Sequence, residues 1–236
     1  LTMKKQIIGI TLAVAGLLLT AQSQAAPITK DSSGTDLTAG TSWIGGNAPT
    51  GADVATWDSS SLGASLALGS PASWAGISVS GALSNIDISG AGPLTLGASG
   101  IDLSASTVNL LMGMPVALGA SQIWTVNTGI TLTSSGAISG AGSLTTAGSG
   151  TVILASPNSY SGGTVVNGGT LKAGSTNCFG PNNSTIMIAA GGTLDVNGLA
   201  LGGLNGTSNY SVTVSGAGVG GNGAIVSSSG SQPKAL

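Results

Sequence analysis

The chain of 236 residues contains 41 glycines, has 5% charged and 3% aromatic side chains, and carries a formal net charge of -2. Because 41% of its residues are hydrophobic and the net charge is low, the composition excludes an intrinsically disordered chain. Its five basic residues are all lysines spread along the chain, so it lacks the basic patch that nucleic-acid binding requires.

The first 25 residues have the order of features that is typical of a secretory signal peptide. Met3, Lys4 and Lys5 form a short positive segment, an apolar run over residues 7–19 follows, and a small-x-small sequence ends at Ala25. The apolar run is too short to span a bilayer, so we predict a signal helix cleaved after Ala25, with a buried core helix as the alternative. Export follows, and membrane contact is expected only through this leader or through a C-terminal anchor outside the sequence.

Residues 26–75 differ from the rest of the chain because they contain most of its tryptophans, Trp43, Trp57 and Trp74. The end of a stacked sheet exposes unpaired backbone groups and is normally covered by a segment of atypical sequence. We therefore predict that this segment is an N-terminal cap and that the indoles pack inside it. The alternative is an exposed platform on which sugar rings stack.

From Gly76 to the C-terminus, apolar residues alternate with Ser, Thr, Asn or Asp, and Gly-rich turns interrupt the pattern. Ile86-Asp87-Ile88 and Leu94-Thr95-Leu96 are two examples. An alternation with period two predicts half-buried strands, and no interval is long enough for a crossover helix. The pattern therefore indicates an all-β protein built as a sandwich, a barrel or a solenoid.

Internal repetition favours the solenoid. Segments 90–100 and 140–150 agree at seven of eleven positions at an offset of 50, and Gly168–Leu171 matches Gly191–Leu194 at an offset of 23. Offsets of about 20 to 25 residues and their doubles are typical of one or two solenoid coils. A buried apolar side chain stabilises by about 1.5 to 3 kcal/mol and ordering a residue costs about 1.5 kcal/mol, so a single coil is marginal and stacked coils are stable.

A specific motif lies at residues 148–174, where a Gly-Thr-Val strand is followed by Asn-x-Tyr-Ser-Gly-Gly-Thr and Asn-Gly-Gly-Thr-Leu. Its characteristic residues are Asn158, Tyr160, Gly162, Gly163, Thr164, Asn167, Gly168, Gly169, Thr170 and Leu171. The stretch closely resembles the autotransporter-associated β-strand repeat, also called the passenger-associated transport repeat, and the likeness extends over residues 115–200. It implies a right-handed parallel β-helix over residues 76–236, in an exported bacterial protein that is often an autotransporter passenger. In that family the repeat is thought to aid export and folding.

The C-terminal sequence departs from the family pattern. A self-translocating autotransporter ends in a membrane β-barrel with aromatic girdles, whereas no aromatic residue follows Val214. We expect that the chain is a C-terminally truncated fragment of a longer protein, and the alternative is a barrel-less relative exported by the secretory route alone.

Few residues are suited to catalysis, since the chain contains no His, Arg or Glu. Asp87 and Asp102 are a conceivable hydrolase pair, because glycoside hydrolysis needs two carboxylates about 5 to 9.5 Å apart, but we interpret them as solvated strand-face residues. Cys178 is the only cysteine, so no intrachain disulfide forms, and we expect a small buried hydrophobe. Residues 220–223 begin like a calcium-binding repeat, but Ile225 replaces its aspartate, so a Gly-rich turn is predicted.

The sequence thus predicts a non-catalytic scaffold without a cofactor, placed at the cell surface, in the outer membrane or outside the cell. Adhesion, or association with a matrix or the envelope, is the expected role, and the partner is an unidentified surface ligand or glycan. The alternative is a carbohydrate-binding or weakly polysaccharide-degrading β-helix module.

Overall fold

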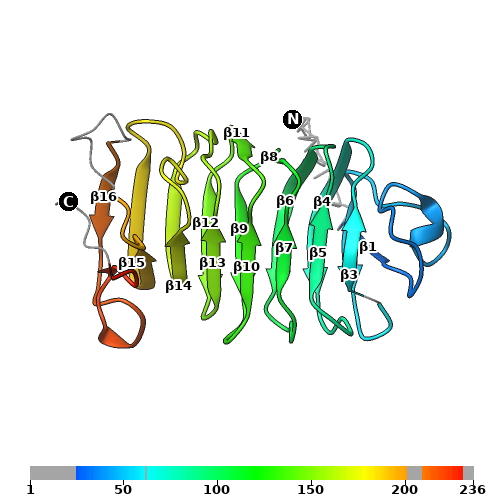
Figure 1. The fold of residues 1–236 in the computed structure, drawn as a ribbon, viewed down its shortest axis with the longest axis horizontal. Helices are drawn as coiled ribbons and strands as arrows, with labels where there is room; N and C mark the ends of the chain where they lie inside the picture. The colour runs from blue at the N-terminus through cyan, green and yellow to red at the C-terminus, as the bar shows by residue number, and fades with distance from the viewer. Residues whose placement is uncertain (1–24, 62, 201–208, 231–236) are drawn as a thin grey trace, which may run out of the picture.

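The computed structural model describes residues 25–61, 63–200 and 209–230. This part of the chain winds into one elongated column of parallel strands, which runs from the N-terminal end in blue to the C-terminal end in red (Figure 1). It contains two 3-10 turns, η1 (Gly40–Ser42) and η2 (Val219–Gly221), and no α-helix. The predicted all-β solenoid is confirmed. No helix among the described residues is long and apolar enough to cross a membrane.

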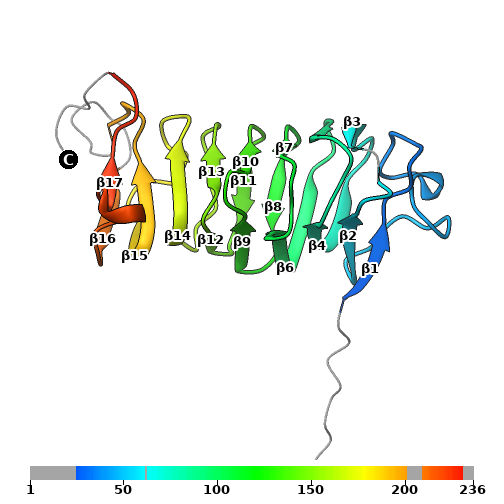
Figure 2. The same ribbon diagram turned by 90° about the horizontal axis from the view of Figure 1, so that it is seen from below.

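Every coil contributes strand segments to parallel ladders that run along the column (Figures 1 and 2). Ladder 1 contains β1 (Ala26–Thr29), β2 (Asp53–Trp57), the second halves of β4 (Ala72–Val79) and β6 (Leu94–Leu103), β9 (Gln122–Val126), β12 (Leu144–Gly148), the first halves of β14 (Thr164–Ala173) and β15 (Thr185–Asp195), and β16 (Ser211–Val214).

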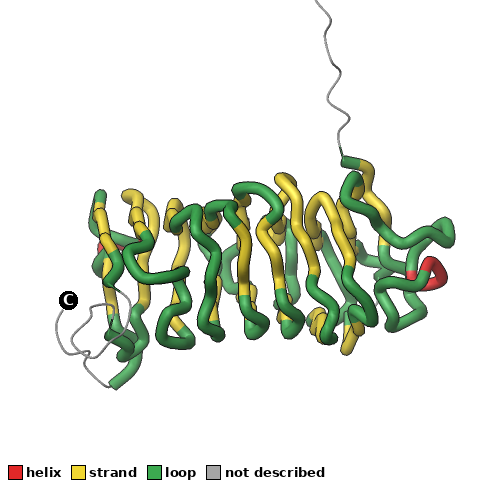
Figure 3. Tube along the Cα trace, turned by 90° about the horizontal axis from the view of Figure 1, so that it is seen from above, coloured by secondary structure: helices red, strands yellow, loops and turns green. Residues whose placement is uncertain are grey.

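Two further ladders complete the coils, and turns join the ladders at the corners (Figure 3). Ladder 2 contains the first halves of β4 and β6 together with β8 (Val116–Leu118) and β11 (Ile138–Gly140). Ladder 3 contains β3 (Ala64–Ala67), β5 (Ile86–Ser89), β7 (Leu110–Met112), β10 (Thr131–Ser134), β13 (Thr151–Leu154), the second halves of β14 and β15, and β17 (Ile225–Val226).

The core lies along the axis of the column, because every second side chain of a strand points inward. Partners on successive coils are similar apolar residues that stack directly on one another. One inward row in ladder 3 is in register and buried throughout, and it consists of Ile86, Leu110, Leu132, Val152, Leu171 and Leu194. Each coil therefore buries the apolar face of its neighbour, as expected for a stack that gains stability at every interface.

The structure confirms one predicted repeat and corrects the other. Gly168–Leu171 pairs residue for residue with Gly191–Leu194, so the offset of 23 is one coil. The offset of 50 is wrong as a structural register, because Leu94 pairs with Val116 in ladder 2 whereas Leu144 pairs with Thr164 in ladder 1. The two similar segments are different corners, where the chains approach so closely that glycine is needed in both.

Parallel stacking begins earlier in the chain than the expected cap boundary at residue 75, which falls inside β4. β1 already pairs with β2, and β2 pairs with β4. Residues 30–52, which include η1, form the part that extends beyond the strands at the N-terminal end of the column (Figure 1). The predicted signal helix, apart from Ala25, lies outside the described residues.

Candidate functional site: the repeat coil and the outer hollows

Asn158 connects three successive coils of the column. Its side-chain oxygen accepts a hydrogen bond from the Ile138 N–H of the preceding coil at 2.7 Å, and its amide nitrogen donates to the Cys178 carbonyl of the following coil at 2.6 Å. The side chain is almost fully buried. A buried amide with both polar atoms paired sets the alignment of its neighbours, because any shift would leave these groups unsatisfied.

Tyr160 and Thr164 form a second buried polar contact within the same coil. Their hydroxyl oxygens lie 2.7 Å apart, and both residues are buried. Burial raises the pKa of Tyr160 far above its ordinary value, despite the hydrogen bond with Thr164. The phenol therefore stays protonated and serves the packing of the coil, not proton transfer.

The glycines of the motif permit the corners between strands. Gly163 and Gly169 have φ angles of 83° and 65°, which are strained for residues with a Cβ atom. A Cβ atom on Gly162 would collide with the backbone of Gly142 on the preceding coil. Asn167 is exposed at the corner, while Leu171 is buried in the core. The motif thus describes one coil that fits closely between two others.

Comparison with known proteins agrees with this geometry. The profile of the family described as Passenger-associated-transport-repeat matches residues 144–173. The chain carries a passenger-associated transport repeat. The repeat extends over β12, β13 and β14, which is a little more than one turn of the column.

A curated relative contains a similar segment. The Adhesin BmaC autotransporter of Brucella suis biovar 1 (strain 1330) is 33% identical to this chain over 105 residues. That match covers 44% of this chain and 3% of the relative, so the chain spans a small fraction of the relative's length. No solved structure matches the chain.

The three tryptophans proposed as a sugar platform lie inside the cap and the first coils. Trp43, Trp57 and Trp74 are 2%, 0% and 1% exposed, and their ring centroids are 5.6, 5.7 and 6.4 Å apart. Trp43 also donates its indole N–H to the Leu37 carbonyl at 3.0 Å. None of these rings offers a face to solvent, so their placement gives the sugar-stacking interpretation no support and agrees with cap packing.

The residues considered for chemistry are not brought together. Asp87 lies in ladder 3 and Asp102 in ladder 1, so they do not form a facing pair. Cys178 is 1% exposed, and burial raises the pKa of its thiol to about 12, which keeps it unreactive. Residues 220–223 form η2 and the turn after it, and the described part of the chain contains no group of three His, Cys, Asp or Glu that could hold a metal ion.

Sequence analysis missed an ion pair near the C-terminal end of the column. The Lys172 ammonium lies 3.5 Å from an Asp195 carboxylate oxygen, and both groups bind the Ser228 hydroxyl, at 2.8 and 2.6 Å. Asp195 also accepts the N–H groups of Asn197 and Ser228, each at 2.9 Å. The offset of 23 between the two matching segments could have revealed that Lys172 and Asp195 are partners on adjacent coils.

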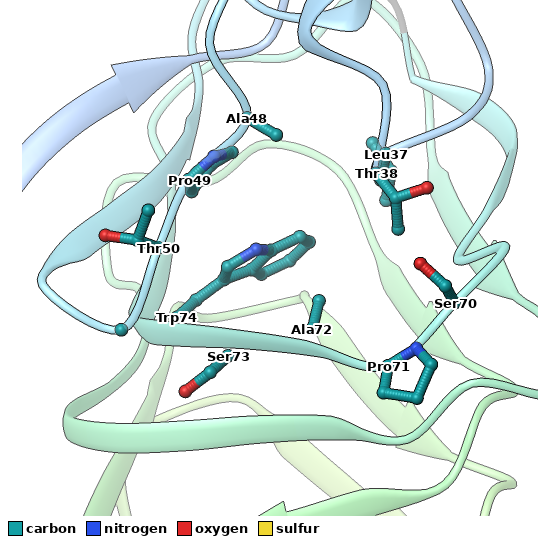
Figure 4. A pocket seen from close by; sticks show the side chains of 11 residues that line it. Leu37, Thr38, Ala48, Pro49, Thr50, Ser70, Pro71, Ala72, Ser73 and Trp74 are labelled. Carbon is teal, nitrogen blue, oxygen red and sulfur yellow. The ribbon is translucent and has the colours of Figure 1, made fainter.

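Two hollows open on the outer surface of the described structure. The cap hollow, of about 380 Å³, is lined by Trp74, by Pro49 and Pro71, and by Thr38 and Thr50 among others (Figure 4). The hydroxyls of Thr38 and Thr50 already donate to Asp36 and Asp53, at 2.7 and 2.6 Å. Its best placed polar groups are therefore committed to the cap itself.

The second hollow, which we name the ladder-3 groove, has a volume of about 340 Å³. It is lined by residues of three successive coils: Asn85, Ile86, Asp87, Asn109, Leu110, Leu111, Thr131 and Thr133. Asp87, Leu111 and Thr133 are register partners on β5, β7 and β10, and they face outward because the residues beside them are buried. Its volume lies within the range of small-molecule sites.

Proposed function

We propose that this chain is a non-catalytic segment of an exported, autotransporter-like passenger, and that it acts as a rigid scaffold for adhesion. The observation that carries the proposal is the position of the repeat coil within a continuous parallel stack. The coil pairs on one side with β9 and β10 and on the other with β15, so it continues the column without an interruption. Adhesion of the named relative supports the role, although the match covers only 3% of that protein.

The chemistry of the described residues supports a structural role. The buried phenol and thiol have raised pKa values and remain protonated, and the Asp195 carboxylate is bonded to Ser228 and Lys172. General acid-base catalysis needs a group that exchanges protons near the working pH and that reaches a substrate. Location at the cell surface, in the outer membrane or outside the cell is part of the same proposal, as is association with a matrix or the envelope.

The test is to express the full chain with its own leader in a Gram-negative host. We expect the chain to be exported, and we expect the recovered protein to bind host cells or matrix-coated surfaces several-fold above a vector control. A polysaccharide panel incubated with the same protein should release no reducing sugar. Turnover that is lost in Asp87→Asn or in Asp102→Asn would show an enzyme and overturn the scaffold proposal.

A further inference from the structure

Two asparagines hold fixed orientations at the edge of the ladder-3 groove. The Asn85 side-chain oxygen accepts the Asn109 N–H at 2.9 Å, and the Asn109 side-chain oxygen accepts the Thr131 N–H at 2.8 Å. Each amide plane is therefore held by the next coil, and its NH₂ group has no acceptor within the described part of the chain. The groove thus has two preoriented hydrogen-bond donors, spaced by one coil.

Asp87 supplies the acceptor beside these donors. Each of the other six aspartates accepts at least one hydrogen bond from its own chain: Asp31, Asp36, Asp53, Asp58, Asp102 and Asp195. Asp87 makes no hydrogen bond or ion pair with the described residues, and neither do the hydroxyls of Thr131 and Thr133. These groups line the groove but contribute nothing to the fold through polar contacts.

Leu111 provides an apolar surface in the same groove, because it is an outward residue of β7 between Asp87 and Thr133. The groove therefore combines donors, an acceptor, two hydroxyls that can act as either, and one aliphatic patch. Sugars have the matching surface, since their hydroxyls donate and accept while their ring C–H groups are apolar. The only charge in the groove is negative, so it disfavours uronates and other anionic sugars.

We propose that the ladder-3 groove is a binding site for a neutral oligosaccharide. Asp87 accepts from sugar hydroxyls, the amides of Asn85 and Asn109 donate to sugar oxygens, and Leu111 packs against a ring. The site adds a ligand class to the proposed scaffold and rests on that proposal only for its exposure at an exported surface. The cap hollow is the weaker candidate, because its threonine hydroxyls are already bonded.

The test is to measure binding of labelled hexasaccharides to the purified full chain. The panel contains neutral glucan, mannan and galactan hexamers and an oligogalacturonate as the anionic comparison. We expect at least one neutral hexamer to bind, the anionic one to bind at least tenfold more weakly, and Asp87→Asn to weaken neutral binding about tenfold or more, since hydrogen bonds to a charged group are the stronger ones. Thr133→Val should weaken it several-fold.

Matched controls lie in ladder 1, away from the groove. Asp102→Asn makes the same charge change and Thr145→Val removes a similar hydroxyl, and both should leave the affinity unchanged. Failure of every neutral hexamer to bind, binding only of the anionic hexamer, or equal effects in groove and control variants would overturn the proposal. Export and cell adhesion are measured separately, so loss of the glycan site leaves the scaffold proposal standing.

Discussion

At the scale of the residue, aspartate serves mainly as a turn former in this protein. Asp31, Asp36 and Asp58 each accept the N–H of the residue two positions on, and each also accepts a Ser or Thr hydroxyl. These hydrogen bonds, first from the hydroxyl and then from the backbone, lower the pKa of all three carboxyls. The Asp-x-Ser/Thr spacing makes this role readable from the sequence.

Asp195 makes stability depend on pH at the C-terminal end of the column. Burial alone would raise the pKa of this carboxyl, but hydrogen bonds from Ser228 and Asn197 and the nearby Lys172 lower it below 3.8. A lowered folded-state pKa means that the stabilisation is complete above 3.8 and is lost as the pH falls through the folded-state value. We expect Asp195→Asn to be less stable than the wild type at neutral pH and the difference to shrink in acid.

Urea unfolding of both proteins from about pH 7 to about pH 2 measures this difference. Lys172→Met is the control, since it keeps the carboxylate and its hydrogen bonds and should therefore retain most of the pH dependence. A stability gap between wild type and Asp195→Asn that stays constant over the whole range would contradict the assignment.

The buried pair of Tyr160 and Thr164 gives a prediction for a single hydrogen bond. Tyr160→Phe and Thr164→Val each remove one hydroxyl and leave the other without a partner, at a cost of about 1 to 3 kcal/mol in unfolding free energy. The double variant leaves no orphan, so we expect it to lose less than the sum of the single losses, with a coupling of about 1 kcal/mol. Equilibrium denaturation of the four proteins checks this, and additive losses would show that the hydroxyls do not interact.

At the scale of the element, the strands were predictable and their register was not. Alternation reveals which side chains of Ile86–Ser89 point inward, because period two belongs to the strand itself. The register needs coil lengths, and these vary: the partners Ala55, Ile77, Ile101 and Trp124 are 22, 24 and 23 residues apart. A similarity at an offset of 50 therefore gave a wrong alignment, whereas the shorter one at 23 was right.

Corner glycines set how closely coils approach, and two of them form a matched test. Gly168 and Gly191 are partners on adjacent coils, but an added Cβ would lie 2.6 Å from the Gly148 oxygen at Gly168 and 3.4 Å from the Asn167 oxygen at Gly191. We expect Gly168→Ala to destabilise the protein by about 1 to 3 kcal/mol, because a backbone oxygen has no room to move. Gly191→Ala should be neutral or slightly stabilising, because alanine restricts the unfolded chain.

Thermal or urea unfolding of the two alanine variants gives the comparison directly. Equal destabilisation would mean that loss of glycine flexibility, and not the approach of the neighbouring coil, determines the effect.

At the scale of the whole molecule, the repeat was identifiable from sequence because its motif is contiguous. Asn158 and Leu171 belong to one coil, so the spacing of the motif contains the information. The ladder-3 groove was not identifiable, because Asp87, Asn109 and Thr131 come from three coils and meet only once the register is known. The tryptophans could be assigned to the cap by composition, but only the packing shows that all three rings are buried.

A stack of coils should tolerate the loss of a whole coil and not of part of one. Thr151 pairs with Thr170, and Thr151 also pairs with Thr131. Deletion of residues 151–169 would thus place Thr170 directly over Thr131, with Leu171 over Leu132 in the core. Deletion of residues 151–160 removes about half a coil and places every later strand over a corner.

We expect the whole-coil deletion to keep the far-UV signature of β-structure and a single urea transition, with a smaller m-value because less surface is exposed on unfolding. Its stability should fall, since one coil interface is lost. The partial deletion should lose the cooperative transition, because its apolar residues no longer meet across coils. Circular dichroism and urea titration distinguish the two, and similar behaviour of both proteins would mean that register between coils does not hold the column together.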